Sequence, residues 1–142
     1  MKKAIYGAAI AVIAVAIIIS LSFEPKPQST SVYHVTLADP KLYSNGIFTD
    51  NFKIQNGSYQ FSFVPNGDSP KKLSISLKGS TFSFSEDFNL EGIPHSTGIS
   101  TYYTWDYVGT KKIQVSDNQD LQITIDPHGQ TLGSISVDLV KT

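Results

Sequence analysis

From Val32 to the C-terminus, apolar and polar residues alternate with a period of two in almost every segment. Successive side chains of a β-strand point to opposite faces, so this pattern predicts strands with one apolar and one polar face. The expected strands cover residues 32–37, 47–54, 58–64, 72–78, 81–85, 102–107, 113–115, 121–125 and 134–140. No segment after residue 31 has the 3.6-residue apolar repeat of an amphipathic helix. The domain of residues 32–142 is therefore expected to be all-β.

Turn-forming residues separate these segments. Asn56-Gly57 lies between two alternating runs and predicts a tight hairpin, because this dipeptide tolerates the positive φ angles of a type I′ turn. Further turns are expected at 65–70, 116–118 and 126–129. Short strands at this spacing predict an antiparallel β-sandwich of about eight to nine strands, with a closed barrel as the alternative.

The N-terminal segment, residues 1–23, predicts a single transmembrane helix. Residues 4–23 are twenty residues without a charge, enough to span the ~30 Å hydrocarbon core of a bilayer. Lys2 and Lys3 precede this run, and positive residues stay on the cytoplasmic side. A Pro- and Ser-rich spacer at 24–31 then holds the domain off the membrane. We expect a single-pass protein of the cell membrane with its C-terminal domain outside the cytoplasm.

Two alternatives remain for this segment. Ser20 and Ser22 fit a signal peptide that is cleaved before Phe23. Lys2-Lys3-Ala4, directly before the apolar run, resembles the leader of archaeal type IV pilins and archaellins. That resemblance implies cleavage ahead of the helix and a role as a surface-filament subunit.

Composition excludes several classes of function. The chain has no cysteine, so disulfides, thiolate metal sites and cysteine nucleophiles are absent. It has no arginine, and residues 32–142 hold eight lysines against eleven acidic residues, a charge of −3 that disfavours nucleic-acid binding. His34, His95 and His128 are isolated, His34 falls on the polar face of its segment, and no Gly-x-Ser-x-Gly motif occurs. We expect a protein that is not an enzyme and uses no cofactor.

The most polar stretch is residues 86–98, which we expect to be an irregular connection between sheets. Its carboxylate and amide groups are oxygen ligands of the kind that calcium prefers, although their spacing does not match an EF-hand. The candidate ligands are Glu86, Asp87, Asn89 and Glu91, with His95 nearby. A solvated connection without a metal is the alternative.

Residues 102–107 contain the one tryptophan and three of the seven tyrosines. Tyr103, Trp105 and Tyr107 share parity, which predicts that they lie in the core. The alternative is a carbohydrate-binding surface in which Tyr102 and Trp105 stack on sugar rings, since aromatic side chains combine a flat apolar face with a polar edge.

Asn56-Gly57-Ser58 is also an N-glycosylation sequon at an expected hairpin tip.

Two resemblances suggest an interaction module. Gly57-x-Tyr59-x-Phe61-x-Phe63, a Pro/Asn/Gly loop and Leu73-x-Ile75-x-Leu77 resemble the central hairpin of Golgi-dynamics (GOLD) domains. Those are lumenal or extracellular β-sandwiches that mediate protein interaction. The whole chain also resembles small membrane-anchored β-sandwich proteins of archaeal envelopes. Both resemblances imply a protein partner at the cell surface or a role in envelope structure, and neither assigns a functional residue.

Overall fold

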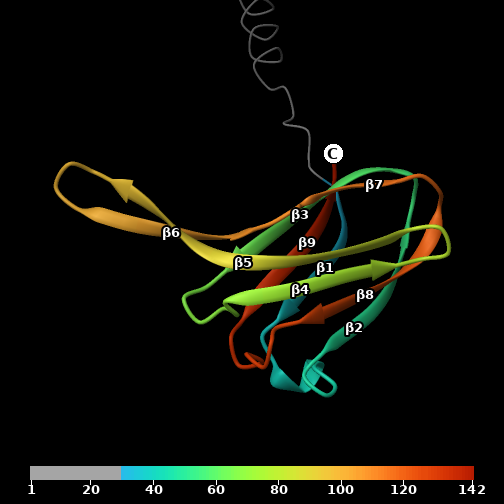
Figure 1. Ribbon diagram of the computed structural model, residues 1–142, viewed down its shortest axis with the longest axis horizontal. Helices are drawn as coiled ribbons and strands as arrows, with labels where there is room; N and C mark the ends of the chain where they lie inside the picture. The colour runs from blue at the N-terminus through green and yellow to red at the C-terminus, as the bar shows by residue number, and fades with distance from the viewer. Residues whose placement is uncertain (1–29) are drawn as a thin grey trace, which may run out of the picture.

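The computed structural model describes residues 30–142 and is all-β, with nine strands in two antiparallel sheets. A four-stranded sheet has the order β1-β9-β3-β7, and a five-stranded sheet has the order β2-β8-β4-β5-β6 (Figure 1). The strands are β1 (Ser31–Leu37), β2 (Phe48–Ile54), β3 (Gly57–Pro65), β4 (Lys72–Lys78), β5 (Ser83–Ser96), β6 (Thr101–Val108), β7 (Lys112–Val115), β8 (Gln119–Asp126) and β9 (Ile135–Lys141). One short 3₁₀ helix, η1 (Pro40–Leu42), lies between β1 and β2. The expected all-β class and sandwich arrangement are confirmed for this part of the chain.

The core forms where the apolar faces of the two sheets meet. Twenty hydrophobic side chains are buried there, and they come from all nine strands. An aromatic cluster links the sheets, with the Phe61 ring 5.8 Å from that of Phe88 and the Phe63 ring 5.1 Å from that of Tyr107. The period-two pattern thus selects inward positions as expected, because one face of each strand packs against the opposite sheet.

The dipeptides Asn56-Gly57 and Asn45-Gly46 behave differently. Asn56-Gly57 does not form the expected hairpin, since β2 and β3 belong to different sheets. The connection crosses between the sheets instead, and the Asn56 N–H is bonded to the Asn118 side chain at 2.8 Å. The type I′ signature appears at Asn45-Gly46, where φ is +52° and +81°.

The edge strands β1 and β2 lie on the same side of the sandwich. The Tyr33 ring lies 4.5 Å from that of Phe52, and the Tyr33 hydroxyl donates to Asp50 at 3.2 Å. Asp50 lies on the same face of β2 as Phe48 and Phe52, which is otherwise apolar. The hydrogen bond from Tyr33 explains how a carboxylate is accommodated on that face.

The predicted anchor at 1–23, the cleavage sites within it and most of the spacer at 24–31 lie outside the described residues. Within residues 30–142, no helix is long and apolar enough to cross a membrane. The described chain begins beside its own end, because the Lys141 N–H donates to the Thr30 carbonyl at 3.1 Å.

Candidate functional site

The β5–β6 hairpin extends well beyond the rest of the sandwich (Figure 1). Strand β5 pairs with β4 only as far as Asn89, whereas its pairing with β6 continues to Ser96 and Thr101. We call residues 91–105 the arm. The expected irregular connection at 86–98 is therefore wrong, because most of it is strand. The alternation of Phe82, Phe84, Phe88 and Leu90 continues through Gly92 and Pro94 to the turn at Gly98, whose φ is +83°.

Exposed apolar side chains concentrate on this hairpin. Ten large hydrophobic residues are exposed within residues 30–142, and six of them lie between β5 and the end of β6. These six are Ile93, Ile99, Tyr102, Tyr103, Trp105 and Val108. Ile99, at the tip, is 99% exposed. Such clustering differs from the scattered single hydrophobics of an ordinary surface and is typical of a binding surface.

The prediction that Tyr103 and Trp105 lie in the core is wrong. Tyr107 is fully buried, but Trp105 is 49% exposed and Tyr103 is 58% exposed. All three occupy the same face of β6, as their parity requires. They differ because the opposite sheet covers Tyr107 and ends before Trp105. The alternation therefore predicted correctly which face of β6 these residues occupy. It could not predict how much of that face the opposite sheet covers.

Trp105 lies on the inner face of the arm, which continues the apolar face of the sandwich. It is opposite Gly92 in the β5–β6 register. A Cβ on Gly92 would lie 3.2 Å from two atoms of the indole ring and 3.4 Å from the Tyr103 ring. Because glycine has no side chain, both rings pack against bare backbone. This contact orients Trp105 while leaving half of it accessible.

A hollow of about 330 Å³ lies beside Trp105, at the base of the arm. Leu90 and Trp105 provide its apolar part, and the β3–β4 and β8–β9 connections provide the rest. The lining residues are Gly67, Asp68, Ser69, Lys71, Leu90, Trp105 and Gln130. Sequence reasoning missed Asp68, Lys71, Gly92 and Gln130, because only the fold brings these separate segments to one side of Trp105.

The outer face of the arm carries Tyr102, which does not share a surface with Trp105. The Tyr102 ring stacks on His95 with centroids 5.0 Å apart, and the His95 Nε2 atom lies 2.8 Å from the Thr104 hydroxyl. The two residues predicted as one sugar-stacking surface, Tyr102 and Trp105, are therefore on opposite faces.

The four candidate calcium ligands are spread along β5 rather than gathered at one point. Glu86 and Asp87 are consecutive in a strand and point to opposite faces. Glu86 accepts from the Thr110 N–H at 2.9 Å, and Asp87 pairs with Lys72 at 3.0 Å. Asn89 and Glu91 follow at two-residue steps toward the arm. Residues 30–142 contain no group of three or more His, Asp or Glu side chains able to hold a metal ion.

Hydrogen bonds to Glu86 and Asp87 favour their charged forms. Bonds from Thr110 lower the pKa of Glu86, and bonds from Ser74 and then Lys72 lower the pKa of Asp87. Burial raises the pKa of Tyr107, whose hydroxyl donates to the Pro70 carbonyl at the base of the arm. The base of the arm is thus tied to the sandwich by polar contacts as well as by the core.

A polar cluster on the outer face of the four-stranded sheet has the composition of a catalytic triad. His34 Nδ1 lies 2.8 Å from Asp138, and His34 Nε2 lies 3.2 Å from the Thr36 hydroxyl. His34 is on the solvent face, as expected from parity, with its side chain 56% exposed. The hollow beside Trp105 and the cavity described next are lined by other residues. Neither of these two cavities therefore encloses the Thr36 hydroxyl.

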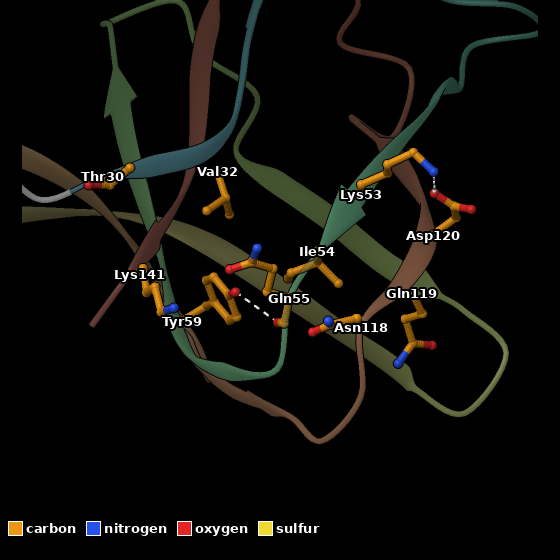
Figure 2. A pocket seen from close by; sticks show the side chains of 10 residues that line it. All are labelled: Thr30, Val32, Lys53, Ile54, Gln55, Tyr59, Asn118, Gln119, Asp120 and Lys141. Carbon is orange, nitrogen blue, oxygen red and sulfur yellow. Dashed lines mark hydrogen bonds and ion pairs between the residues drawn. The ribbon is translucent and has the colours of Figure 1, made fainter.

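A cavity of about 720 Å³ lies where β1 begins. Figure 2 shows that its polar side chains are paired with one another: Lys53 with Asp120 at 3.0 Å, and the Tyr59 hydroxyl with the Gln55 carbonyl at 2.8 Å. The side chains of Asn118 and Gln119 are also engaged, with the Asn56 N–H and the Thr81 hydroxyl, so we regard this cavity as a weaker candidate. Asn56, the sequon residue, is exposed on the nearby β2–β3 connection.

Comparison of the chain with protein-family models, with curated proteins and with solved structures finds no match to any of them. We therefore infer the function of the chain from the geometry of the site.

Proposed function

We propose that this chain is a membrane-anchored, extracytoplasmic interaction module that binds a partner protein through the arm and catalyses no reaction. The exposed apolar surface of the arm carries this proposal. Residues 92–105 contain no Asp, Glu or Lys, and the arm projects clear of the sandwich (Figure 1). A hairpin of this kind gains little stability from its own fold, since its side chains are largely in water. A partner that covers Ile99 and Tyr103 would bury part of that surface.

The open edge of β6 suggests how a partner strand is held. The Leu90 N–H donates to the Lys71 carbonyl at 2.8 Å, so Leu90 faces β4, and Glu91 faces β6. By the same alternation, Thr101, Tyr103 and Trp105 direct their backbone N–H and C=O groups to the open edge. An extended partner segment can add to this edge as a further strand.

Two of the three other edge strands, β2 and β7, are protected against such pairing. Strand β2 carries Asp50 and Lys53, and β7 has only four residues, beginning with Lys112. Charged and short edges discourage strand addition, whereas the arm part of β6 has neither protection. This contrast supports β6 as the contact edge.

The anchoring part of the proposal rests on the sequence of residues 4–23, with Lys2 and Lys3 on the cytoplasmic side. The pilin-like alternative differs in its mature N-terminus. Mass spectrometry of the chain from membranes would find an intact N-terminus for an anchor, a start at Phe23 for a cleaved signal peptide, and a start near Ala4 or Ile5 for a pilin-like subunit.

The absence of cysteine permits a direct test of location and contact. Single cysteines are introduced as Ile99→Cys in the arm and, as a control, Ser62→Cys on the exposed outer face of β3. A membrane-impermeant maleimide should label both in intact cells. Labelling that requires permeabilised cells would contradict the extracytoplasmic location.

A benzophenone photo-cross-linker attached at the same two positions tests the contact. We expect a discrete protein adduct at position 99 and none at position 62. The protein in that adduct should bind the purified full-length chain, and Tyr103→Glu should weaken binding about tenfold, because a charge on the edge opposes strand pairing. Equal cross-linking at both positions, or unchanged binding by the Tyr103→Glu variant, would refute the arm as the contact.

A further inference from the structure

The hollow beside Trp105 has the features of a preformed site. Its aromatic wall is held in place by Gly92, where two ring atoms lie 3.2 Å from the position of a Cβ. Its opposite rim is equally fixed, because a Cβ on Gly133 would meet the Asp68 carbonyl oxygen at 1.8 Å. The two connections are packed in direct contact there, and neither needs to be ordered when a ligand arrives.

Hydrogen bonds between the β3–β4 and β8–β9 connections hold the rim of the hollow in place. Ser69 is the one polar residue that is buried in the described part of the chain, at 4% exposure. Its hydroxyl accepts from the Asn66 N–H at 2.6 Å and donates to the Ser134 carbonyl. The Lys71 N–H donates to the Gln130 side-chain carbonyl at 2.6 Å. These bonds join the β3–β4 connection to the β8–β9 connection at the hollow.

Three polar groups at the hollow have no partner within residues 30–142: the Asp68 carboxylate, the Lys71 ammonium and the Gln130 side-chain NH₂. They provide one acceptor and two kinds of donor. The two charges are opposite, so the site favours neither an anion nor a cation. The ligand they fit is neutral, offers donors and acceptors together, and has an apolar face for the indole ring.

We propose that this hollow binds a neutral saccharide. The C–H face of one sugar ring lies on Trp105, and the hydroxyl groups of that ring exchange hydrogen bonds with Asp68, Lys71 and Gln130. A volume of about 330 Å³ is at the lower end of the range for small-molecule sites, which suits one or two sugar rings. A second hollow of about 320 Å³ shares Asp68 and Gln130, and offers room for a longer chain. The proposal is independent of strand pairing at β6.

The single tryptophan makes the test direct, because all tryptophan emission comes from this site. Full-length chain is prepared in a detergent without a sugar headgroup and applied to an array of neutral and anionic glycans. Soluble oligosaccharides of glucose, galactose, mannose and N-acetylglucosamine are then titrated while the emission is followed. We expect a saturable change in emission with at least one neutral oligosaccharide, with a dissociation constant on the order of 10 µM to 1 mM.

Matched variants separate the contributions. Trp105→Ala should abolish binding measured by calorimetry. Asp68→Asn or Lys71→Met should weaken it about tenfold, since the first removes the charge from a hydrogen-bond acceptor and the second removes a charged donor. Asp68 and Lys71 are exposed, so these variants should fold normally, as far-UV circular dichroism would verify. Ile99→Ser, at the tip of the arm, should leave saccharide binding unchanged and impair only the protein contact.

Three results would overturn the saccharide site. They are retention of anionic glycans alone, no emission change with any neutral oligosaccharide, and undiminished binding by folded Trp105→Ala. Loss of the cross-link at position 99 with saccharide binding intact would refute the proposed protein contact and leave the saccharide site standing.

Discussion

Replacing residues 92–105 with Asn-Gly tests whether the arm is independent of the folded core. This change joins Glu91 to Asp106, which face one another in the β5–β6 register. The Leu90–Lys71 bond places Glu91 in a hydrogen-bonded pair with β6, the geometry that a two-residue type I′ turn closes. The shortened hairpin therefore keeps its register up to the new turn.

The expected loss of stability is small, because none of the twenty buried hydrophobic residues lies between positions 92 and 105. The main loss is the buried half of Trp105. A fully buried tryptophan removes about 150–250 Å² from water, so half of that is about 100 Å² and contributes at most about 2.5 kcal/mol. Folding of the shortened chain no longer requires residues 92–105 to become ordered. The conformational entropy that is retained offsets part of the lost burial free energy. We expect the free energy of unfolding to fall by no more than about 2.5 kcal/mol.

Urea unfolding followed by far-UV circular dichroism measures this change, and Phe88→Ala provides the comparison. Phe88 is fully buried on the same strand, and its truncation should cost about 3–5 kcal/mol through the cavity it leaves. The reasoning is refuted if the shortened chain loses its cooperative transition or is destabilised as much as Phe88→Ala.

Three further outcomes are expected. A chain that begins at Thr30 should fold alone with a β-type far-UV spectrum and a cooperative thermal transition, since the buried hydrophobic residues of the described range lie between Tyr33 and Leu139. Substantial helix or an insoluble product would contradict the domain boundary. The lowered pKa values of Glu86 and Asp87 mean that the unfolded chain binds more protons, so their stabilisation is complete above the ordinary values of 4.5 and 3.8 and is lost as the pH falls below them. Asp87→Asn should therefore flatten the decline of melting temperature between about pH 5 and pH 2, and Asp120→Asn, in an exposed pair with Lys53, serves as the control. Gly133→Ala should lower the free energy of unfolding by about 1–3 kcal/mol and change Trp105 emission, because the new Cβ would collide with the backbone at Asp68. Emission identical to that of the unaltered chain would show that the rim and Trp105 are uncoupled.

Much of the fold could be predicted from the alternation of residue types. The inward positions of β1, β3, β4, β8 and β9 follow from sequence parity, as does the exposed position of His34. The long strand β5 was missed because Glu86, Asp87, Asn89 and Glu91 were interpreted as a polar loop. Those residues include the outward positions of a strand whose inward positions are Phe88 and Leu90.

The candidate site was only partly predictable. The aromatic content of residues 102–107 identified the right segment, but Asp68, Lys71, Gly92 and Gln130 could not be connected with Trp105. No local spacing links them, because they lie on three separate stretches of the chain. An Asn-Gly dipeptide does not indicate by itself whether the segments that flank it share a sheet.

The sequence by itself determined most of the strands, the greater part of β5 excepted, and which side chains of each strand share a face, because the two-residue period is a property of the extended backbone. The tertiary structure alone decided which strands belong to the same sheet and how far each sheet covers the other. Tyr107 and Trp105 illustrate the division: both lie on the same face of β6, yet one is fully buried and the other is half exposed. The difference arises because burial depends on what lies opposite a side chain, and the opposing sheet is built from residues distant in sequence.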